Sequence, residues 1–316
     1  MRRLLAVSAL AALVSVTSCS SDESGASSDN DDVATHTVKH LEGSTQVPDD
    51  PERVVTLWAS TLSATVALGE QPVGYAFNDE PAPGVDVPED YDLDSLDHLG
   101  DSQELDLERI AAAEPDLILA TEVQADYYDQ LSDIAPTVIL EWGGTSVWKQ
   151  HLRDVAEVLQ REDEADKVES DYRAHVDEVA DAIGGPSATE VSIVRFHADE
   201  LRLEVRNSFA GQVVADVGLA RPEVQDVEEE ESGYLAVSLE QLPDADGDAL
   251  FAFTIADSDD PQEDDLLESA RDNPLWKQLD AVRKDRVHEV DYMTWISSNY
   301  FAAHAILDDL ESALGT

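Results

Sequence analysis

A helical stretch in the middle of the chain most strongly limits the fold that this sequence can adopt. Between residues 146 and 183, apolar residues recur at steps of three and four, and no Pro or Gly interrupts them before Gly184. The second part of this stretch predicts one helix of about 20 residues, which would be about 30 Å long. Because a helix of that length can connect two lobes, the sequence predicts a two-lobed chain.

Short apolar strands alternate with helices on both sides of this stretch, which is typical of α/β lobes whose sheets are covered on both faces. The predicted fold is α/β, with two lobes joined by one long helix and a ligand cleft between them. The predicted domains are an N-terminal lobe at 35–145, linking helices at 146–185 and a C-terminal lobe at 186–316. The predicted strands are 53–57, 72–76, 115–120, 136–140, 191–196, 201–205, 250–255 and 287–290, and the predicted helices are 60–68, 105–113, 127–134, 210–217, 266–271 and 299–314.

The charge of the chain excludes two classes of function. The 316 residues include 70 Asp and Glu but only 19 Lys and Arg, for a formal net charge of −51. Binding to a nucleic-acid backbone or to anionic lipid through a basic patch requires the opposite balance. An acidic surface with few Lys is suited to high salt, where mutual repulsion is screened. A salt-rich source and an ordinary acidic exported protein are both compatible with this composition.

The first residues have the pattern of an export signal. Two arginines precede an apolar stretch at 4–16, which is too short to span a bilayer as a permanent helix of about 20 residues. The stretch ends in small residues before Cys19, the only cysteine of the chain, and so resembles the lipobox of bacterial lipoproteins. We therefore expect a signal peptide at 1–18 and a lipidated Cys19 that begins a polar, disordered tether at 19–34. An ordinary signal peptide followed by an unrelated cysteine is the alternative.

Five stretches between residue 35 and the C-terminus resemble one known family. They are 37–55, 107–118, 194–222, 237–240 and 273–311, and they include Pro51-Glu52-Arg53-Val54-Val55 and Asn273-Pro274-Leu275-Trp276. In this order, behind a lipobox-like cysteine, they resemble the iron–siderophore substrate-binding lipoproteins of ABC importers, which have a class III periplasmic binding protein fold. The resemblance implies a non-catalytic monomer without a cofactor, anchored at the outer face of the cell membrane. It implies that the protein delivers a ferric siderophore to a permease with its ATPase; cobalamin and haem are alternative ligands.

A ferric siderophore needs flat aromatic walls and a cation rather than metal-coordinating side chains, because the chelator already surrounds the iron. Arg195 lies near the end of the predicted strand 191–196, where the family often places a ligand-facing Arg; a salt-bridged structural role is the alternative. Ligands of α/β sheets bind at the carboxyl ends of strands. The aromatic candidates that follow predicted strands are Trp58, Trp142 and Trp295, and further wall candidates are Asn78 and Tyr234.

Two glutamates are candidates for a different role. Glu108 and Glu240 occur where helices are predicted to begin, one in each lobe. They resemble the surface glutamates with which this family docks on arginines of the permease.

Three other patterns suggest chemistry that the rest of the sequence does not support. Gly100-Asp101-Ser102 with Asp285 and His288 resembles blocks of a serine esterase family, but Ser102 follows a polar loop instead of the first strand. The acidic run at 244–248 lacks the Gly and Glu of a calcium loop. The eight histidines are scattered and have no cysteine to help them, so we expect no metal site.

Overall fold

The fold was analysed in a computed structural model that describes residues 34–77, 87–88, 91–143, 147–197, 200–229, 232–254 and 269–315. The predicted export signal, Cys19 and Asn78 lie outside the described residues. In the part of the chain that the structure describes, no helix is long and apolar enough to cross a membrane.

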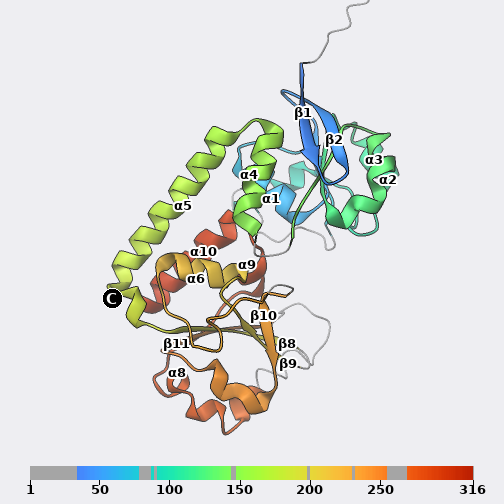
Figure 1. The fold of residues 1–316 in the computed structure, drawn as a ribbon. Coiled ribbons are helices and arrows are strands. Elements are labelled where there is room, and N and C mark those ends of the chain that lie inside the picture. Colours follow the sequence, from blue (N-terminus) through green and yellow to red (C-terminus); the bar gives the residue numbers. More distant parts are fainter. Residues whose placement is uncertain are drawn as a thin grey trace, which may run out of the picture. The chain divides into compact units, whose positions relative to one another are not determined.

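The N-terminal lobe, drawn in blue to green in Figure 1, contains a five-stranded sheet. All neighbouring strands of this sheet are parallel. In the central strand, Leu117 and Leu119 pack into one apolar cluster while Ile118 and Ala120 pack into another, so both faces are covered. The order of the strands is β5 (Asp97–His98), β4 (Gly74–Tyr75), β3 (Val54–Thr56), β6 (Leu117–Thr121) and β7 (Thr137–Leu140). The other elements are the hairpin β1 (Thr35–His40) and β2 (Gly43–Pro48), the helices α1 (Ala59–Ala67), α2 (Leu107–Ala112) and α3 (Tyr128–Ser132), and the 3-10 helices η1 (Leu93–Ser95) and η2 (Glu122–Tyr127).

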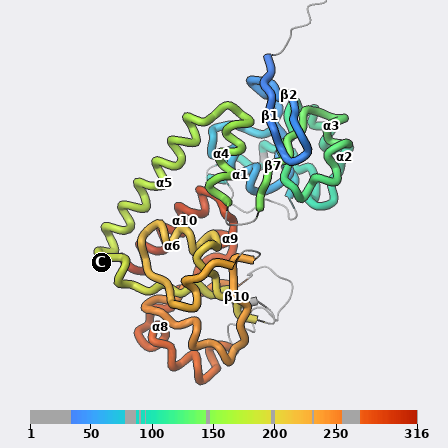
Figure 2. The backbone as a smooth tube through the Cα atoms, in the orientation of Figure 1, coloured from blue at the N-terminus to red at the C-terminus, as the bar shows by residue number. Residues whose placement is uncertain are grey.

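Two helices follow this lobe, and the second is the long helix that the sequence predicts. They are α4 (Trp148–Leu159) and α5 (Glu162–Ile183), separated by Gln160, which has a left-handed φ of 54°. Three acidic residues in the first turn of α5 stabilise the helix, because their negative charges lie at the positive end of its dipole. The helix ends at Gly184, whose φ of 73° is left-handed. Its 22 residues span about 33 Å, and Figure 2 shows its uninterrupted course.

The C-terminal lobe has a mixed sheet. β8 (Val191–His197), β11 (Ala249–Thr254) and β12 (Val287–Glu289) are parallel, whereas β9 (Glu200–Glu204) runs antiparallel to β8. Only two residues separate β8 from β9, and a parallel crossover needs a dozen or more. β10 (Tyr234–Val237) continues the sheet antiparallel to β9. The remaining elements are α6 (Phe209–Val217), α8 (Asp280–Arg283), α9 (Tyr292–Ile296), α10 (Tyr300–Leu314), η4 (Pro186–Ala188), η5 (Leu239–Ala245) and η6 (Trp276–Gln278).

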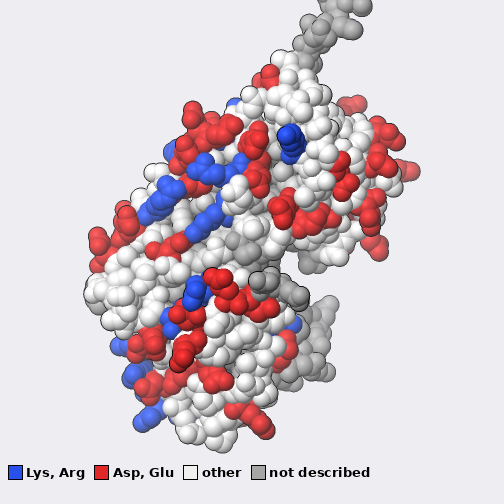
Figure 3. Space-filling view, in the orientation of Figure 1, with Lys and Arg blue, Asp and Glu red and all other residues white. Residues whose placement is uncertain are grey.

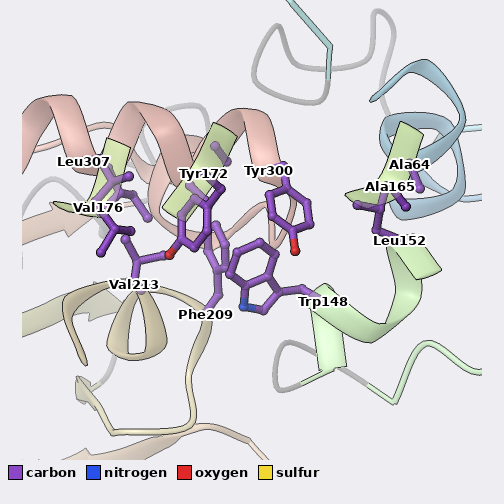
Figure 4. Packing of buried hydrophobic residues seen from close by; sticks show 14 of the residues in the cluster. Ala64, Trp148, Leu152, Ala165, Tyr172, Val176, Phe209, Val213, Tyr300 and Leu307 are labelled. Atoms are coloured by element: carbon purple, nitrogen blue, oxygen red, sulfur yellow. The ribbon is translucent and has the colours of Figure 1, made fainter. Parts of the chain in front are cut away.

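An aromatic cluster joins α5 to three other helices, α4, α6 and α10. Trp148 of α4, Tyr172 of α5, Phe209 of α6 and Tyr300 of α10 meet edge to face, with ring centroids 4.8–5.7 Å apart (Figure 4). Each such pair contributes about 0.5–1.5 kcal/mol beyond the area that it buries. The cluster therefore fixes the linking helices to the first turn of α10.

Two histidines that are far apart in the sequence meet between α5 and α10. The rings of His175 and His304 stack with centroids 5.1 Å apart, and their Nδ1 atoms lie 2.8 Å apart. Burial and the neighbouring His175 lower the pKa of His304. Because the partners lie on different helices, their spacing along the chain does not reveal the pair. Among the described residues no group of three or more His, Cys, Asp or Glu could hold a metal ion.

Candidate functional site

A cavity of about 260 Å³ lies at the carboxyl ends of the N-terminal strands and is closed by α9. Trp58 follows β3, Phe77 follows β4 and Trp142 follows β7, while Met293 and Ile296 come from α9. The lining is completed by Ala59, Ser60, Ser102, Ser297 and Ser298. Apolar and aromatic walls with a few hydroxyl groups suit a flat ligand with polar edges. The structure thus brings two of the three predicted tryptophans together in a cleft formed by both lobes.

The position of Trp58 is fixed by the start of α1. Its backbone is extended, with φ −151° and ψ 150°, as is usual for the residue that caps a helix. The hydroxyl of Thr61 donates to the carbonyl oxygen of Trp58 over 2.7 Å and accepts from its backbone N–H over 3.3 Å. The helix start therefore holds this wall of the cavity in place.

Trp142 packs edge-on against His151 of α4, with ring centroids 5.2 Å apart and an interplanar angle of 79°. Burial lowers the pKa of His151, so its imidazole is neutral at pH 7. Its Nδ1 lies 3.3 Å from the carbonyl oxygen of Glu141, and a neutral ring must carry its proton there to donate to that oxygen. His151 thereby contacts both the ring of Trp142 and the backbone before it.

Arg195 is part of a cationic cluster on the sheet of the C-terminal lobe. The antiparallel register places it directly opposite Arg202 of β9. Both guanidinium groups lie over the ring of Tyr234, at 4.9 and 4.5 Å from its centroid. Each also has an acidic partner, with Arg195 Nε 3.2 Å from Glu204 and Arg202 Nε 2.8 Å from Glu200. Arg195 is therefore ion-paired and also faces the predicted wall residue Tyr234.

A third arginine, Arg221, is buried next to this cluster. Arg221 is only 7% exposed and donates to the carbonyl oxygen of Glu204 and to Gln225. Burial lowers the pKa of Arg221 to about 10, and burial raises the pKa of Glu204 against the opposing effect of Arg195, Arg221 and Arg202. Glu204 thus contacts two arginines, Arg221 through its backbone carbonyl oxygen and Arg195 through its carboxylate.

Trp295 lies in the core and not among the residues that line the cavity. It is 1% exposed, stacks on Phe251 at 4.8 Å, and donates its indole N–H to Asp309 over 2.8 Å. Its neighbours Met293 and Ile296 are three residues apart on α9, so they share one face of the helix, and that face meets the cavity. The sequence analysis missed both residues, and the apolar i, i+3 spacing is the signal that could have indicated them.

The two glutamates lie where the sequence predicts. Glu108 is in the first turn of α2 and Glu240 is in the first turn of η5, and both are exposed. Their positions at helix starts are confirmed, while the docking role is a prediction that this geometry permits.

The other sequence patterns have structural roles. Ser102 is 1% exposed, and its carbonyl oxygen accepts from Gln124, whereas His288 stacks on Phe251 in the other lobe at 5.1 Å. Asp246 accepts from the backbone N–H groups of Asp280 and Ala281, so the acidic run at 244–248 anchors a neighbouring turn.

Comparisons with known proteins identify the family. The family described as periplasmic binding protein matches residues 75–292. A probable siderophore-binding lipoprotein, YfiY, of Bacillus subtilis is 33% identical over 96% of this chain and 95% of its own length. The Fe(3+)-citrate-binding protein YfmC of the same organism is 29% identical over 92% of this chain and 90% of its own length.

The crystal structure of Staphylococcus aureus SirA complexed with staphyloferrin B superposes with a TM-score of 0.76 at 27% identity, over 89% of this chain and 98% of SirA. The fold and the family resemblance predicted from the sequence are thereby confirmed, and the chain belongs to the periplasmic binding protein family.

Proposed function

We propose that this protein captures a ferric siderophore outside the cell and delivers it to the permease of an ABC importer. The observation that carries the proposal is the cavity between Trp58 and Trp142, whose flat walls suit a preformed chelate. The names of the similar proteins support the same ligand class. The protein would act by binding and release, as a monomer without catalysis.

The cationic cluster supports a negatively charged chelate. In a chain with net charge −51, two guanidinium groups that converge on one aromatic ring form an unusual local environment. A carboxylate or catecholate edge of a ligand would pair with Arg195 and Arg202, whose guanidinium groups both lie over the ring of Tyr234.

Fluorescence of the purified protein tests the ligand class. We would titrate it at high salt with ferric hydroxamate, ferric catecholate, ferric citrate, cobalamin and haem. One ferric chelate is expected to quench the tryptophan emission saturably, and Trp142→Ala is expected to weaken that binding at least about thirtyfold, as for a central aromatic contact. Saturation by cobalamin or haem alone would replace the ligand, and no saturable response to any of the five would overturn the proposal.

Docking on the permease is proposed to use Glu108 and Glu240. Reversing both charges, with Glu108→Lys and Glu240→Lys, is expected to abolish uptake of the iron complex by cells, because like charges would then face the permease arginines. Affinity for the ligand should stay within about twofold of wild type, since neither residue lines the cavity.

The matched control is Glu104→Lys with Glu223→Lys, which changes the total charge equally at exposed positions. Loss of uptake in this control, or loss of ligand affinity in the docking variant, would contradict the docking role.

We also propose that Cys19 carries a lipid that holds the protein at the outer face of the cell membrane. The single cysteine after a short apolar stretch supports this, as do relatives named lipoproteins.

A further inference from the structure

One carboxylate outside the cavity holds two successive backbone groups of its wall. Glu122 Oε2 accepts from the N–H of Trp142 over 2.7 Å, and Oε1 accepts from the N–H of Gly143 over 2.8 Å. Gly143 has φ 54°, the left-handed conformation in which neighbouring N–H groups can point toward one anion. Both carboxylate oxygens of Glu122 thus accept hydrogen bonds from the backbone of the residues that follow β7.

The 3-10 helix η2, which begins at Glu122, is itself held in place by hydrogen bonds. Glu122 opens η2, where Thr121 donates from its backbone N–H and its hydroxyl to Gln124 Oε1 over 3.0 and 3.1 Å. Gln124 is fully buried and donates its amide to the carbonyl oxygen of Ser102 over 2.7 Å. Because Ser102 also lines the cavity, η2 is hydrogen-bonded to two of its walls.

Trp142 is also contacted by His151 of α4. His151 contacts the indole ring edge-on and bonds the carbonyl oxygen of Glu141, the residue before Trp142. The backbone of Trp142 is therefore fixed by Glu122, and its ring rests on a buried side chain. A free loop would have to be ordered when ligand binds, at a cost of about 0.5–1.5 kcal/mol per side chain.

The geometry points to Glu122 as a positioning residue that preorganises Trp142 for the ligand. It contacts no ligand itself in this proposal, which rests on the proposed function of the cavity. Removing its charge-assisted hydrogen bonds would leave the ligand to order Trp142, so the dissociation constant is expected to rise about three- to tenfold.

The test variant is Glu122→Gln. A Gln side chain has one acceptor oxygen, so its amide group would face one of the two N–H groups that the carboxylate accepts from. The matched control is Glu141→Gln, which removes the same charge one residue from Trp142 without changing these two hydrogen bonds. Both side chains are exposed, so both variants are expected to fold.

Two measurements separate this proposal from the proposed function. In the ligand-free protein, the emission of Trp142, obtained by difference from Trp142→Phe, should become more accessible to acrylamide in Glu122→Gln and stay unchanged in Glu141→Gln. In ligand titrations, Glu122→Gln should weaken binding in the wild-type background but add nothing in a Trp142→Ala background, because it acts through that ring.

Unchanged acrylamide accessibility in Glu122→Gln would overturn the positioning role, whether or not the protein binds a ferric chelate. Wild-type affinity in a variant whose Trp142 has become accessible would overturn the link to the ligand. An equal loss of affinity in the Trp142→Ala background would show that Glu122 does not act through Trp142, and would also overturn it.

Discussion

Replacing Arg195 with Ala is expected to lower the free energy of unfolding by about 3 kcal/mol at pH 7, in addition to weakening ligand binding. The substitution removes the arginine that is ion-paired with Glu204, which is 7% exposed, and leaves only the longer-range attraction of Arg221 and Arg202 on that carboxylate. Removing one partner of a buried ion pair costs more than the net energy of the pair, because it leaves an uncompensated charge. Urea unfolding of the ligand-free protein measures this loss.

The loss should depend on pH in a defined direction. Burial already raises the pKa of Glu204 above its ordinary value, and Arg195 opposes that rise. Without Arg195 the folded pKa moves further up, so the folded variant binds a proton more tightly than its unfolded chain does. The variant should therefore lose stability relative to wild type as pH rises through the range in which Glu204 ionises in the folded wild type, while at lower pH, where Glu204 is protonated in both proteins, the two should approach each other.

A double variant distinguishes this electrostatic cause from lost packing. Arg195→Met with Glu204→Gln removes both charges and keeps similar volumes, and it should recover most of the lost stability. The electrostatic explanation would be contradicted if Arg195→Ala lowered the free energy of unfolding equally at pH 4 and pH 7 and if the double variant were equally destabilised.

The melting temperature is expected to rise by at least about 5 °C between about 0.1 M and about 1 M KCl. Across this range the Debye length falls from about 10 Å to about 3 Å, which screens much of the repulsion among 70 acidic residues. In a chain of this size 5 °C corresponds to roughly 2 kcal/mol of stability. Calorimetry at several salt concentrations measures the shift.

The form of the salt dependence identifies screening as the cause. A screening effect should level off once the Debye length is a few ångströms, whereas sucrose, which acts by exclusion from the surface, should raise the melting temperature in proportion to its concentration. A melting temperature that falls with KCl would exclude adaptation to salt, and an unchanged one would favour an ordinary acidic exported protein.

The strands and helices were largely predictable because burial on two faces leaves continuous apolar runs, as in β6, and burial on one face leaves a helical period, as in α5. Trp58 and Trp142 were predictable for a related reason: they directly follow strands whose carboxyl ends share one edge. The direction of β9 was not predicted, although the short gap between the predicted strands 191–196 and 201–205 excludes a parallel crossover. This direction sets the pairing of Arg195 with Arg202.

The remaining site residues depend on contacts that the sequence does not encode locally. The rotation of α9 decides that Met293 and Ile296 face the cavity while Trp295 faces the core. Glu122 is one of 70 acidic residues, and only its approach to the backbone after β7 distinguishes it.

The ion pairs on the linking helices combine one enclosed carboxylate with two exposed guanidinium groups. Figure 3 shows acidic groups spread over the visible face and basic groups gathered in two places, along the linking helices and at the lower left near α8. The Glu169 side chain is only 11% exposed, whereas its partners Arg153 of α4 and Arg173 of α5 are 39% and 68% exposed. Mobile ions screen exposed charges. Salt should therefore act on this chain in two opposite ways: it relieves the repulsion among the acidic groups on the surface, and it weakens the attraction between Arg153 and Glu169 that joins α4 to α5.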